Sequence, residues 1–418
     1  MRCLIVSCVF PPEPVVSSQT SAQVSEGLRA RNIDAVVIAP FPNRPGGKLY
    51  PGYHRGLILR EPQGVGYEVI RCFSTFSSES TTASRFLENI SFGITSGLTA
   101  FLIGKPDVIY ANSWPIFATG ILCIVACLRR VPLVISVQDI YPESLISQQH
   151  IRADSWLARF LKRIDAAIAC RSAAVIVISP SFAALYRDKR AVSSERIKII
   201  PNWIDSATIT PNDPHGVTVR ANLNLSTGMR LGVYGGNIGM AAGVETLIES
   251  IRYFENENSF HLLVAGEGSQ LSACQNRAQQ LSPNRVTFHT PWPKDETSSV
   301  LSAADFLILP TRGQQSLASV PSKLITYMLS AKPVLALAWP DSDLANIIGQ
   351  SGCGWVVEPD RPDLLAAQIR CVLAIDASEL SRRGMAGRQY ALANFSKEVC
   401  LPKVIDILER VAVQLDDN

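Results

Sequence analysis

The chain has 418 residues, of which 47% are hydrophobic and 18% are charged, and its formal net charge is +3. Because one ordinary core holds fewer residues than this, we expect two domains of about 200 residues each. The composition is that of a globular protein and excludes the low-complexity classes. The ten cysteines form no C-x-x-C pair, which favours buried thiols over a structural zinc site.

The charge is distributed unevenly along the chain. Residues 1–200 hold 22 Lys and Arg against 14 Asp and Glu, whereas residues 201–418 hold 17 against 22. A basic N-terminal half suits an anionic partner, such as a phospholipid surface or a lipid-diphosphate-linked acceptor, although ordinary solvated charge explains the same count. The basic residues are neither densely clustered nor interleaved with aromatic residues, so nucleic acid is not an expected partner.

The chain begins with the apolar segment MRCLIVSCVF, which Pro11-Pro12 follow at once. The segment is short for a signal peptide and lacks a small-residue cleavage site, so we predict a buried first strand. The most apolar later stretch, 114–128, is shorter than the roughly 20 residues that span a bilayer. We therefore expect a cytoplasmic protein without a transmembrane helix.

Short β-branched runs alternate with longer amphipathic stretches in the first half of the chain. Strands are expected at 3–8, 35–39, 68–71, 108–110, 133–137, 175–178 and 197–200. Helices are expected at 17–31, 95–104 and 155–172. Since the strands are continuous apolar runs rather than alternating ones, they predict a parallel sheet covered on both faces.

The same alternation starts again after residue 202. Strands are expected at 231–234, 261–265, 286–289, 306–309, 334–337 and 354–357. The fold class is therefore α/β, with two doubly wound Rossmann-like domains in tandem. We place them at 1–203 and 204–396, with the proline-led segment 201–205 as the hinge, and we expect 397–418 to pack back on the first domain.

A glycine loop, Gly235–Gly239, follows the strand at 231–234 directly and precedes a helix expected near Gly243. Glycines let the backbone approach a ligand closely, and a helix N-terminus attracts anions, so a diphosphate is the expected ligand. An ordinary strand–helix turn remains the alternative. The dinucleotide pattern G-x-G-x-x-G fails because Asn237 and Met240 occupy its second and third glycine positions, which disfavours a dehydrogenase.

A second anion-binding segment, 316–323, follows the strand at 306–309 and opens another helix. Ser319 and Ser322 offer hydroxyl groups, and Lys323 offers a positive charge. Two such segments at the carboxyl ends of one parallel sheet predict a single divided site for a diphosphate.

Two strand ends lie between these segments and are expected to flank a nucleobase. One holds Gly266 and Glu267, and the other holds Thr290, Pro291 and Trp292. Backbone groups of the second strand end are suited to a uracil edge, and Trp292 either stacks on the base or merely packs against a loop.

In the first half, the strand at 133–137 delivers Gln138, Asp139 and Glu143 to its carboxyl end, where open α/β sheets bind ligands. Transfer to a hydroxyl needs a proton acceptor, for which Asp139 is our first choice and Glu143 the second. The alternative is that Asp139 caps the following segment and Glu143 is solvated.

Three further residues are expected at this edge. Asn112 and Ser113 follow the strand at 108–110 and are predicted to line the acceptor pocket. Ser17, expected in the loop after the first strand, is predicted to touch the donor phosphates across a cleft.

Two stretches of the first half, 95–103 and 113–128, are unusually apolar. Basic residues stand near them in sequence: Arg129, Arg130, Lys162, Arg163, Arg187, Lys189 and Arg190. This mixture predicts peripheral contact with the inner face of the plasma membrane, although core helices with basic flanks give the same pattern.

Segments along the whole chain resemble glycosyltransferase family 4. They are IPNWID (200–205), YGGNIG (234–239), AGEGSQL (265–271), AADFLILP (303–310), SVPSKLITYMLSAKPVLA (319–336), SGCGWVVEPDRPDLLA (351–366) and GRQYALANFSKE (387–398). FPPEP (10–14) and VQDIYPES (137–144) are similar to hexose and amino-sugar transferases of bacterial O-antigen, capsule and exopolysaccharide assembly. A weaker likeness is to cyanobacterial heterocyst-envelope polysaccharide transferases.

The resemblance implies a GT-B architecture, with an acceptor domain and a nucleotide-sugar domain facing a central cleft. It implies a retaining enzyme that transfers a hexose from a UDP-sugar, with UDP-glucose as the donor, to a lipid-linked or saccharide acceptor. No cofactor is expected, and no metal is expected because helix N-termini and Lys323 would stabilise the leaving diphosphate.

The resemblance also assigns residues. Gly236, Asn237 and Gly239 would lie against the donor diphosphate. The segment from Ser319 to Lys323, which includes Val320, Pro321 and Ser322, would supply backbone amides to the phosphate and sugar. Glu267 and 290–292 would border the base.

The chain departs from the family pattern in three places. Met240 and Ala242 occupy the stretch where an arginine and a lysine are usual, and Ala318 and Thr326 replace two glutamates. Gln138 stands where a histidine near the reacting sugar is expected. These departures leave two alternatives, a UDP-sugar epimerase of the same fold and a non-catalytic nucleotide-sugar-binding subunit.

Overall fold

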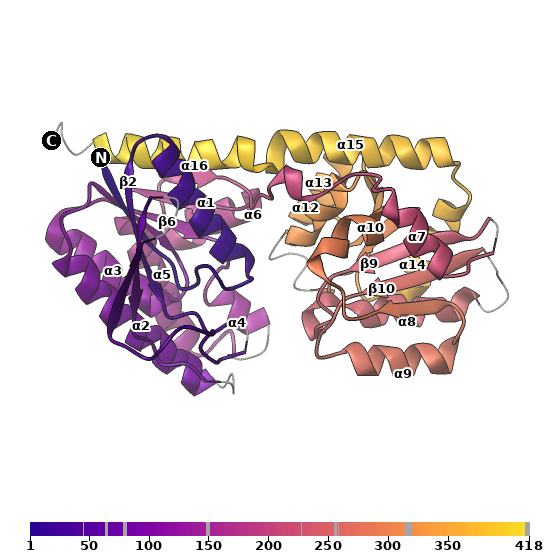
Figure 1. Cartoon of the computed structure of the whole chain (residues 1–418), viewed down its shortest axis with the longest axis horizontal. Coiled ribbons are helices and arrows are strands. Elements are labelled where there is room, and N and C mark those ends of the chain that lie inside the picture. The colour runs from indigo at the N-terminus through magenta and orange to yellow at the C-terminus, as the bar shows by residue number, and fades with distance from the viewer. Residues whose placement is uncertain are drawn as a thin grey trace. The chain divides into compact units, whose positions relative to one another are not determined.

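The computed structural model describes residues 1–44, 46–62, 66–77, 82–147, 151–226, 228–254, 257, 259–313 and 320–413. The chain divides into two compact units, Met1–Pro201 with Cys400–Asn418, and Asn202–Val399 (Figure 1). The sequence placed the boundary at 203/204, and the contacts place it at 201/202.

The first unit contains an eight-stranded sheet in the order β3-β4-β2-β1-β5-β6-β7-β8. The strands are β1 (Arg2–Val6), β2 (Asp34–Pro40), β3 (Ile58–Pro62), β4 (Glu68–Cys72), β5 (Val108–Asn112), β6 (Leu133–Val137), β7 (Ala174–Val177) and β8 (Ile197–Ile199). All neighbouring strands are parallel except β3 and β4, which are antiparallel. The buried runs of β1, β2, β5, β6 and β7 explain this arrangement, because parallel strands need apolar residues on both faces.

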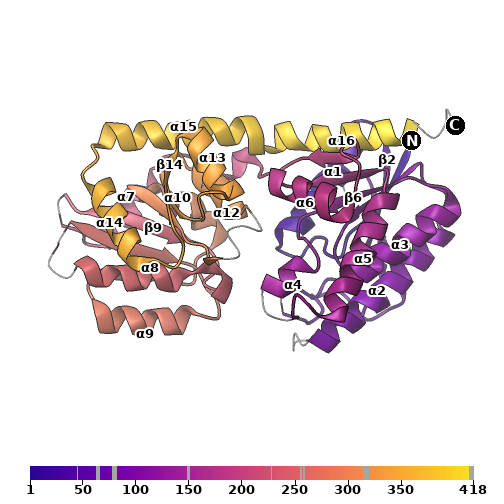
Figure 2. The ribbon, with the colours of Figure 1, turned by 180° about the vertical axis from the view of Figure 1, so that it is seen from behind.

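Helices cover both faces of this sheet (Figures 1 and 2). They are α1 (Val16–Ala30), α2 (Thr82–Leu102), α3 (Ile116–Arg129), α4 (Glu143–Ser147), α5 (Trp156–Arg171) and α6 (Pro180–Arg190). Helices α2, α3 and α5 pack side by side on one face. Serines start two of them: Ser155 Oγ accepts from the amide of Ala158, and Ser179 Oγ accepts from that of Phe182.

The last helix, α16 (Lys397–Val413), reaches the first unit from Cys400 onward and packs on α1. A Cβ added at Gly27 would lie 2.6 Å from Cδ1 of Ile405, so glycine allows the close approach of the two helices. Arg31 Nη1 pairs with Asp406 at 2.6 Å and with Glu409 at 2.7 Å.

The second unit contains a six-stranded parallel sheet in the order β11-β10-β9-β12-β13-β14. The strands are β9 (Arg230–Gly235), β10 (Phe260–Ala265), β11 (Val286–His289), β12 (Phe306–Leu309), β13 (Val334–Leu337) and β14 (Gly354–Val357). The helices are α7 (His215–Asn222), α8 (Val244–Ser250), α9 (Leu271–Leu281), α10 (Thr297–Ser302), α12 (Ser322–Leu329), α13 (Asp343–Ser351), α14 (Pro362–Leu373) and α15 (Ala377–Phe395). One apolar cluster lies under α10, α12 and α13, and another under α8, α9 and α14.

The predicted α/β class with two Rossmann-like domains is confirmed. The structure corrects two details. Strand β3 was not predicted, because it lies at the antiparallel edge and its first residues, Ile58 and Leu59, are exposed. Helix α2 starts at Thr82 rather than near residue 95. No helix in the described ranges combines the length and apolarity that a bilayer crossing requires.

Candidate active site

The glycine loop follows β9, which β10 and β12 flank. Gly235 is buried, and Gly236 has a φ of 153°, which residues with side chains rarely adopt. The expected helix does not follow directly, because a 3-10 turn (Met240–Ala242) intervenes and α8 begins at Val244 after left-handed Gly243. The diphosphate role predicted for the loop therefore depends on its own backbone and its neighbours rather than on the N-terminus of α8.

The loops after β9 and β10 pack backbone against backbone. A Cβ added at Gly266 would overlap the carbonyl oxygen of Gly236, and one added at Gly268 would overlap that of Ile238. The amide of Ile238 donates to the carbonyl of Glu267 at 2.7 Å, and the Glu267 side chain is exposed. The glycines of the second loop are thus needed for contact with the first loop, which is a different role from contact with a base.

Lys323, on α12, lies against the glycine loop. Its Nζ donates to the hydroxyl of Tyr234 and, at 3.4 Å, to the carbonyl of Asn237. The ammonium lies 4.6 Å from the Tyr234 ring centroid. A Cβ at Gly236 would overlap the lysine side chain, so glycine is the residue that leaves room for it.

The charge of Lys323 has no carboxylate partner among the described residues. The side chain is partly buried, and desolvation lowers the pKa of its ammonium to about 8. An uncompensated, desolvated cation beside exposed loop backbone favours an anionic ligand.

Two buried tyrosines fix the loop, and neither was among the predicted site residues. The Tyr234 hydroxyl donates to the carbonyl of Asn237 at 2.6 Å. The Tyr327 hydroxyl accepts from the amide of Gly235 at 2.8 Å and donates to its carbonyl at 3.0 Å. The sequence held a signal for Tyr327, because it lies four residues after Lys323 and therefore on the same face of α12.

The N-terminus of α12 supplies part of the predicted second segment. Pro321 precedes the helix, no side chain caps it, and Ser322 is its first residue. Val320, Pro321 and Ser322 are all partly exposed. Ser319, also predicted here, lies outside the described residues.

Trp292 packs against the glycine loop, which is one of the two roles left open for it. A Cβ at Gly235 would lie 2.7 Å from Cη2 of Trp292. The indole Nε1 is buried without a hydrogen-bond partner in the described part of the chain. Thr290, which follows β11, is partly exposed.

Arg312, which follows β12, is a second cation near the loop that sequence reasoning missed. A Cβ at Gly243 would lie 3.5 Å from its Cγ. Arg312 Nη2 pairs with Glu245 Oε1 at 3.2 Å, and its side chain is 42% exposed. The other oxygen of Glu245 is buried without a partner among the described residues.

One Asp-x-Asp sequence, a spacing in which two carboxylates can share a metal ion, occurs at Asp341-Ser342-Asp343. Ser342 Oγ caps α13 by accepting from the amide of Ala345 at 3.1 Å, and Asp343 is 8% exposed in the first turn. Asp341 is exposed.

In the first unit, two predicted residues meet at the carboxyl edge of the sheet. Ser17 lies in the first turn of α1 rather than in a loop, and its Oγ donates to Oε1 of Gln138 at 2.6 Å. Asp139 follows Gln138 and has an exposed side chain, yet the surrounding protein desolvates it and raises the pKa of its carboxyl. A raised pKa suits a group that accepts a proton.

The contacts of Glu143 do not support its predicted role as a base. Arg190 Nη2 donates to Glu143 Oε2 at 2.7 Å, and Lys162 lies 3.7 Å from the other oxygen. Arg190 is 2% exposed and also pairs with Asp165 at 2.7 Å. Glu143 therefore neutralises a buried cation, a structural task.

Of the predicted acceptor residues, Asn112 is the last residue of β5 rather than a residue after the strand, and Ser113 follows it. Asn112 Nδ2 donates to Ser7 Oγ at 3.0 Å, and the amide of Ser113 donates to the carbonyl of Ser136 at 2.9 Å. Both side chains are partly exposed. The contacts of Asn112 show that it also joins β5 to the end of β1.

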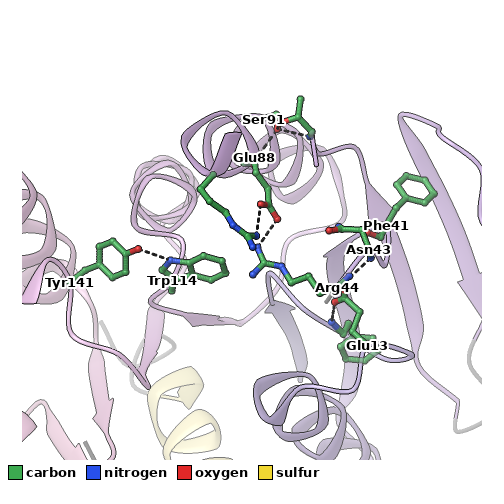
Figure 3. Close-up of polar contacts among 11 residues, drawn as sticks. Glu13, Phe41, Asn43, Arg44, Glu88, Ser91, Trp114 and Tyr141 are labelled. Atoms are coloured by element: carbon green, nitrogen blue, oxygen red, sulfur yellow. Dashed lines mark hydrogen bonds and ion pairs between the residues drawn. The ribbon is translucent and has the colours of Figure 1, made fainter. Parts of the chain in front are cut away.

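An arginine–aromatic cluster that was not predicted lies at the same edge (Figure 3). Arg44 lies 4.7 Å above the Trp114 ring and pairs with Glu88 at 2.6 Å. Trp114 Nε1 donates to the Tyr141 hydroxyl at 3.1 Å. Buried Glu13 accepts from the amide of Arg44 at 2.9 Å and so fixes its backbone.

Both units match models of glycosyltransferase domains. The model "Glycosyl transferase 4-like domain" matches residues 17–203, and "Glycosyl transferases group 1" matches residues 230–374. The chain belongs to glycosyltransferase family 4. This glycosyltransferase is 27% identical to the glycosyltransferase WbjE of Pseudomonas aeruginosa, over 65% of this chain and 66% of WbjE. It is 24% identical to the colanic acid biosynthesis glycosyl transferase WcaI of Escherichia coli, over 97% of this chain and 99% of WcaI.

The fold of the glycosyltransferase is similar to that of HepE of Anabaena, solved in complex with UDP and also with UDP-glucose. The UDP complex gives a TM-score of 0.69 at 17% identity, with 100% of both chains covered. The fold is GT-B, and the family matches support a transferase rather than the epimerase or the non-catalytic subunit that the sequence left open.

The structure locates the departures of this glycosyltransferase from its family pattern. Met240 is 63% exposed, and Thr326 is partly exposed on α12. Ala318 lies outside the described residues. Among the described residues, Lys323 contacts the loop itself and Arg312 lies beside Gly243, which follows it.

Proposed function

We propose that this glycosyltransferase transfers a hexose from a UDP-sugar to a lipid-diphosphate-linked or saccharide acceptor in cell-surface polysaccharide synthesis. The uncompensated ammonium of Lys323 against the glycine loop is the observation that carries the donor site. UDP and glucose are favoured by the complexes of HepE, and surface polysaccharide by the colanic acid assignment of WcaI. UDP-glucose is the proposed donor.

On this proposal the donor diphosphate lies on Gly236, Asn237 and Gly239, with Lys323 and the first amides of α12 facing its negative charge. Preorganised donors of this kind stabilise charge that develops on a leaving group. Glu267 and 290–292 border the base, and Ser319 remains a proposed phosphate contact. Ser17 donates its only hydroxyl hydrogen to Gln138, so its proposed contact with a phosphate requires that hydrogen bond to be given up.

Asp139 accepts the proton of the attacking acceptor hydroxyl, and Asn112, Ser113 and the arginine–aromatic cluster bind the acceptor. The hydroxyl attacks from the face that the nucleotide leaves, so the sugar keeps its anomeric configuration. The hydrogen bond from Ser17 orients Gln138 beside this position.

The proposal can be tested by measuring the melting temperature with UDP, GDP, ADP and their glucose and N-acetylglucosamine derivatives. A ligand that binds the folded chain stabilises it by RT ln(1 + [L]/Kd), so UDP-glucose at 100 Kd adds about 2.7 kcal/mol. Stabilisation by another nucleotide but not by UDP or UDP-glucose would reject the donor assignment.

We further propose that transfer needs no metal, because Lys323 and backbone amides offset the diphosphate charge. Transfer of radiolabelled glucose should continue at an unchanged rate in EDTA. Activity that disappears in EDTA and returns with manganese would contradict this, and Asp341→Asn would then be the variant to examine.

We also propose that the enzyme acts peripherally at the inner face of the plasma membrane. Helices α2, α3 and α5 expose large apolar side chains: Phe86, Leu87, Ile94, Leu98, Phe101, Leu102, Ile124, Leu128, Trp156 and Phe160. We call this set the apolar face. Exposed Lys105, Arg159 and Arg163 accompany it, whereas Arg190 is buried in its ion pairs and takes no part.

Vesicles that contain phosphatidylglycerol should sediment the protein at low salt. Replacing Leu98 and Leu102 by Ser should weaken this binding, while exchanging Leu57, exposed beside β3, should not. Equal sedimentation of both variants would reject the apolar face as the contact.

A further inference from the structure

A pocket of about 530 Å³ lies in the first unit, away from the site described above. Its lining includes residues 131–133 before and at the start of β6, 172–173 before β7, and Arg196 before β8. It therefore opens at the amino ends of these strands, whereas Gln138 and Asp139 follow the carboxyl end of β6. The ends of α3 and α5 and Val411 of α16 complete the wall.

Three exposed arginines line this pocket: Arg130, Arg171 and Arg196. The lining contains no Asp or Glu. Within the described ranges none of the three arginines has an ion-pair partner. With no carboxylate to offset them, the three arginines give the pocket a local excess of positive charge. Their mutual repulsion would be relieved by an anion.

Two of the guanidinium groups are held in place by backbone carbonyls. Arg196 Nη1 donates to the carbonyl of Cys170 at 2.8 Å, and Arg171 Nη1 donates to that of Ala167 at 3.1 Å. Each bond uses one nitrogen of a planar group with five donor hydrogens, so most donors of both groups are left over. Arg130 and Arg171 lie at the C-terminal ends of α3 and α5, where the helix dipole favours a positive charge. Arg196 precedes strand β8, so no helix dipole accounts for its charge.

The backbone at Arg130 decides which substitution the position tolerates. Arg130 ends α3 in the left-handed conformation, with φ 51° and ψ 53°. Glycine is the favoured residue at this position, because a Cβ there is crowded by the backbone. A glycine at position 130 would therefore suit this backbone, although Ala191 shows that other residues also end a helix in the left-handed conformation.

We propose that this basic pocket binds a phosphorylated anion, a phosphate monoester or diester, at a site separate from the transfer reaction. Arginine presents parallel donors that match two oxygens of one phosphate, and three arginines can neutralise a dianion. A soluble sugar or glycerol phosphate and a phospholipid headgroup share this chemistry. Exposed Leu128 and Ile124 on the adjoining end of α3 could accompany a lipid.

Cys127 gives a direct readout, because it lines the pocket and is exposed. Cys371, exposed on α14 of the other unit, is the internal control. The full-length protein, in phosphate-free buffer, is treated with a maleimide, and the alkylation rate of each cysteine is followed by mass spectrometry. The probes are glycerol 1-phosphate, phosphatidylglycerol–phosphatidylcholine vesicles and pure phosphatidylcholine vesicles.

The expected result is slower alkylation of Cys127, with Cys371 unchanged, in glycerol 1-phosphate or in the phosphatidylglycerol vesicles. Protection by glycerol 1-phosphate identifies a soluble phosphate ester as sufficient, and protection by the anionic vesicles alone identifies a headgroup. No protection by either probe, or equal protection by pure phosphatidylcholine, would overturn the proposal.

Arg130→Gly removes one guanidinium and relieves the left-handed backbone, so the melting temperature should stay the same or rise. Its probe concentration for half-protection should rise about tenfold or more, as for loss of one charged hydrogen bond. Arg60→Gln, which removes an exposed arginine of the same unit outside both the pocket and the apolar face, is the control. Protection that Arg130→Gly leaves intact, or that both variants weaken equally, would count against a specific site.

Discussion

The ammonium of Lys323 lies over the ring of Tyr234, 4.6 Å from its centroid, and also donates to the Tyr234 hydroxyl. An aromatic face attracts a cation but offsets its charge less than a carboxylate does. The residues are 89 positions apart, and the Lys323 side chain also lies against Gly236 of the glycine loop. The pair therefore keeps a positive charge beside the loop without neutralising it.

Lys323→Met should weaken donor binding while leaving the fold intact. Methionine keeps the straight apolar chain that packs against Gly236, so the main loss is the charged hydrogen bond, about 1.5–3 kcal/mol. UDP affinity measured by calorimetry should fall about 10- to 100-fold. Lys403→Met, an exposed lysine of α16 in the other unit, should bind UDP as the wild type does. Unchanged affinity in Lys323→Met would remove this residue from the donor site.

The lowered pKa of Lys323, to about 8, predicts how donor binding depends on pH. Above pH 8 the free enzyme loses the charge, whereas the bound diphosphate stabilises it, so binding takes up a proton. The UDP association constant should fall by up to about tenfold per pH unit above 8. In Lys323→Met this slope should be absent, and a slope that persists there would assign it to another group.

The same pKa has the opposite effect on the stability of the free protein. Between pH 8 and the ordinary pKa of about 10.4, the unfolded chain binds the Lys323 proton and the folded chain does not. The contribution of this lysine to the free energy of unfolding therefore rises with pH over that range. Above pH 8, the UDP association constant should therefore fall while the Lys323 contribution to the free energy of unfolding rises. Both trends originate in the Lys323 side chain.

The parallel core could be predicted from the sequence because each strand is a continuous apolar run. The carboxyl ends of those strands then place Gln138, Asp139 and the glycine loop at ligand-binding edges, independently of any side-chain contact. The edge strand β3 was missed because it has exposed residues and an antiparallel neighbour. The formation of β3 depends on its pairing with β4 more than on the hydrophobic pattern of its own residues.

Side-chain partners could not be predicted, because they depend on distances that only the folded chain sets. Glu143 and Arg190 are 47 residues apart, and nothing in either local sequence indicates that they pair. The pattern of Gly266 and Gly268 predicts that something approaches the backbone closely. It does not say whether a ligand does so or, as the structure has it, the neighbouring loop.

Gly266→Ala should disrupt the donor site by separating two loops. Its Cβ would overlap the backbone of Gly236, and its φ of 139° is unfavourable for alanine, so we expect a loss of about 1–3 kcal/mol in the free energy of unfolding. UDP binding should weaken with it.

Gly349→Ala is the matched control for Gly266→Ala. Gly349 lies within α13, and nothing lies within 4 Å of its added Cβ. Alanine should therefore stabilise the helix by up to about 1 kcal/mol and leave UDP binding unchanged. Chemical denaturation and calorimetry on both variants check this pair, and wild-type stability in Gly266→Ala would show that the loops can move apart without cost.

Asp139→Asn should lower turnover about 10²- to 10⁴-fold, because the amide cannot accept the proton of the acceptor hydroxyl. In the wild type the raised pKa of Asp139 means that activity is lost as the pH falls through a value above that of an ordinary aspartate. Asp139→Asn should lose this acidic limb from its pH–rate profile while it keeps its affinity for UDP.

Glu143→Gln tests whether Glu143 has a structural role while Asp139 acts as the base. Arg190 keeps Asp165 but loses a charged partner, so the free energy of unfolding should fall by about 1–3 kcal/mol. Turnover below the melting transition should stay near that of the wild type, with the acidic limb intact. If Glu143→Gln instead abolished the acidic limb and Asp139→Asn preserved it, the base would be Glu143, and its ion pair with Arg190 would have to open during catalysis.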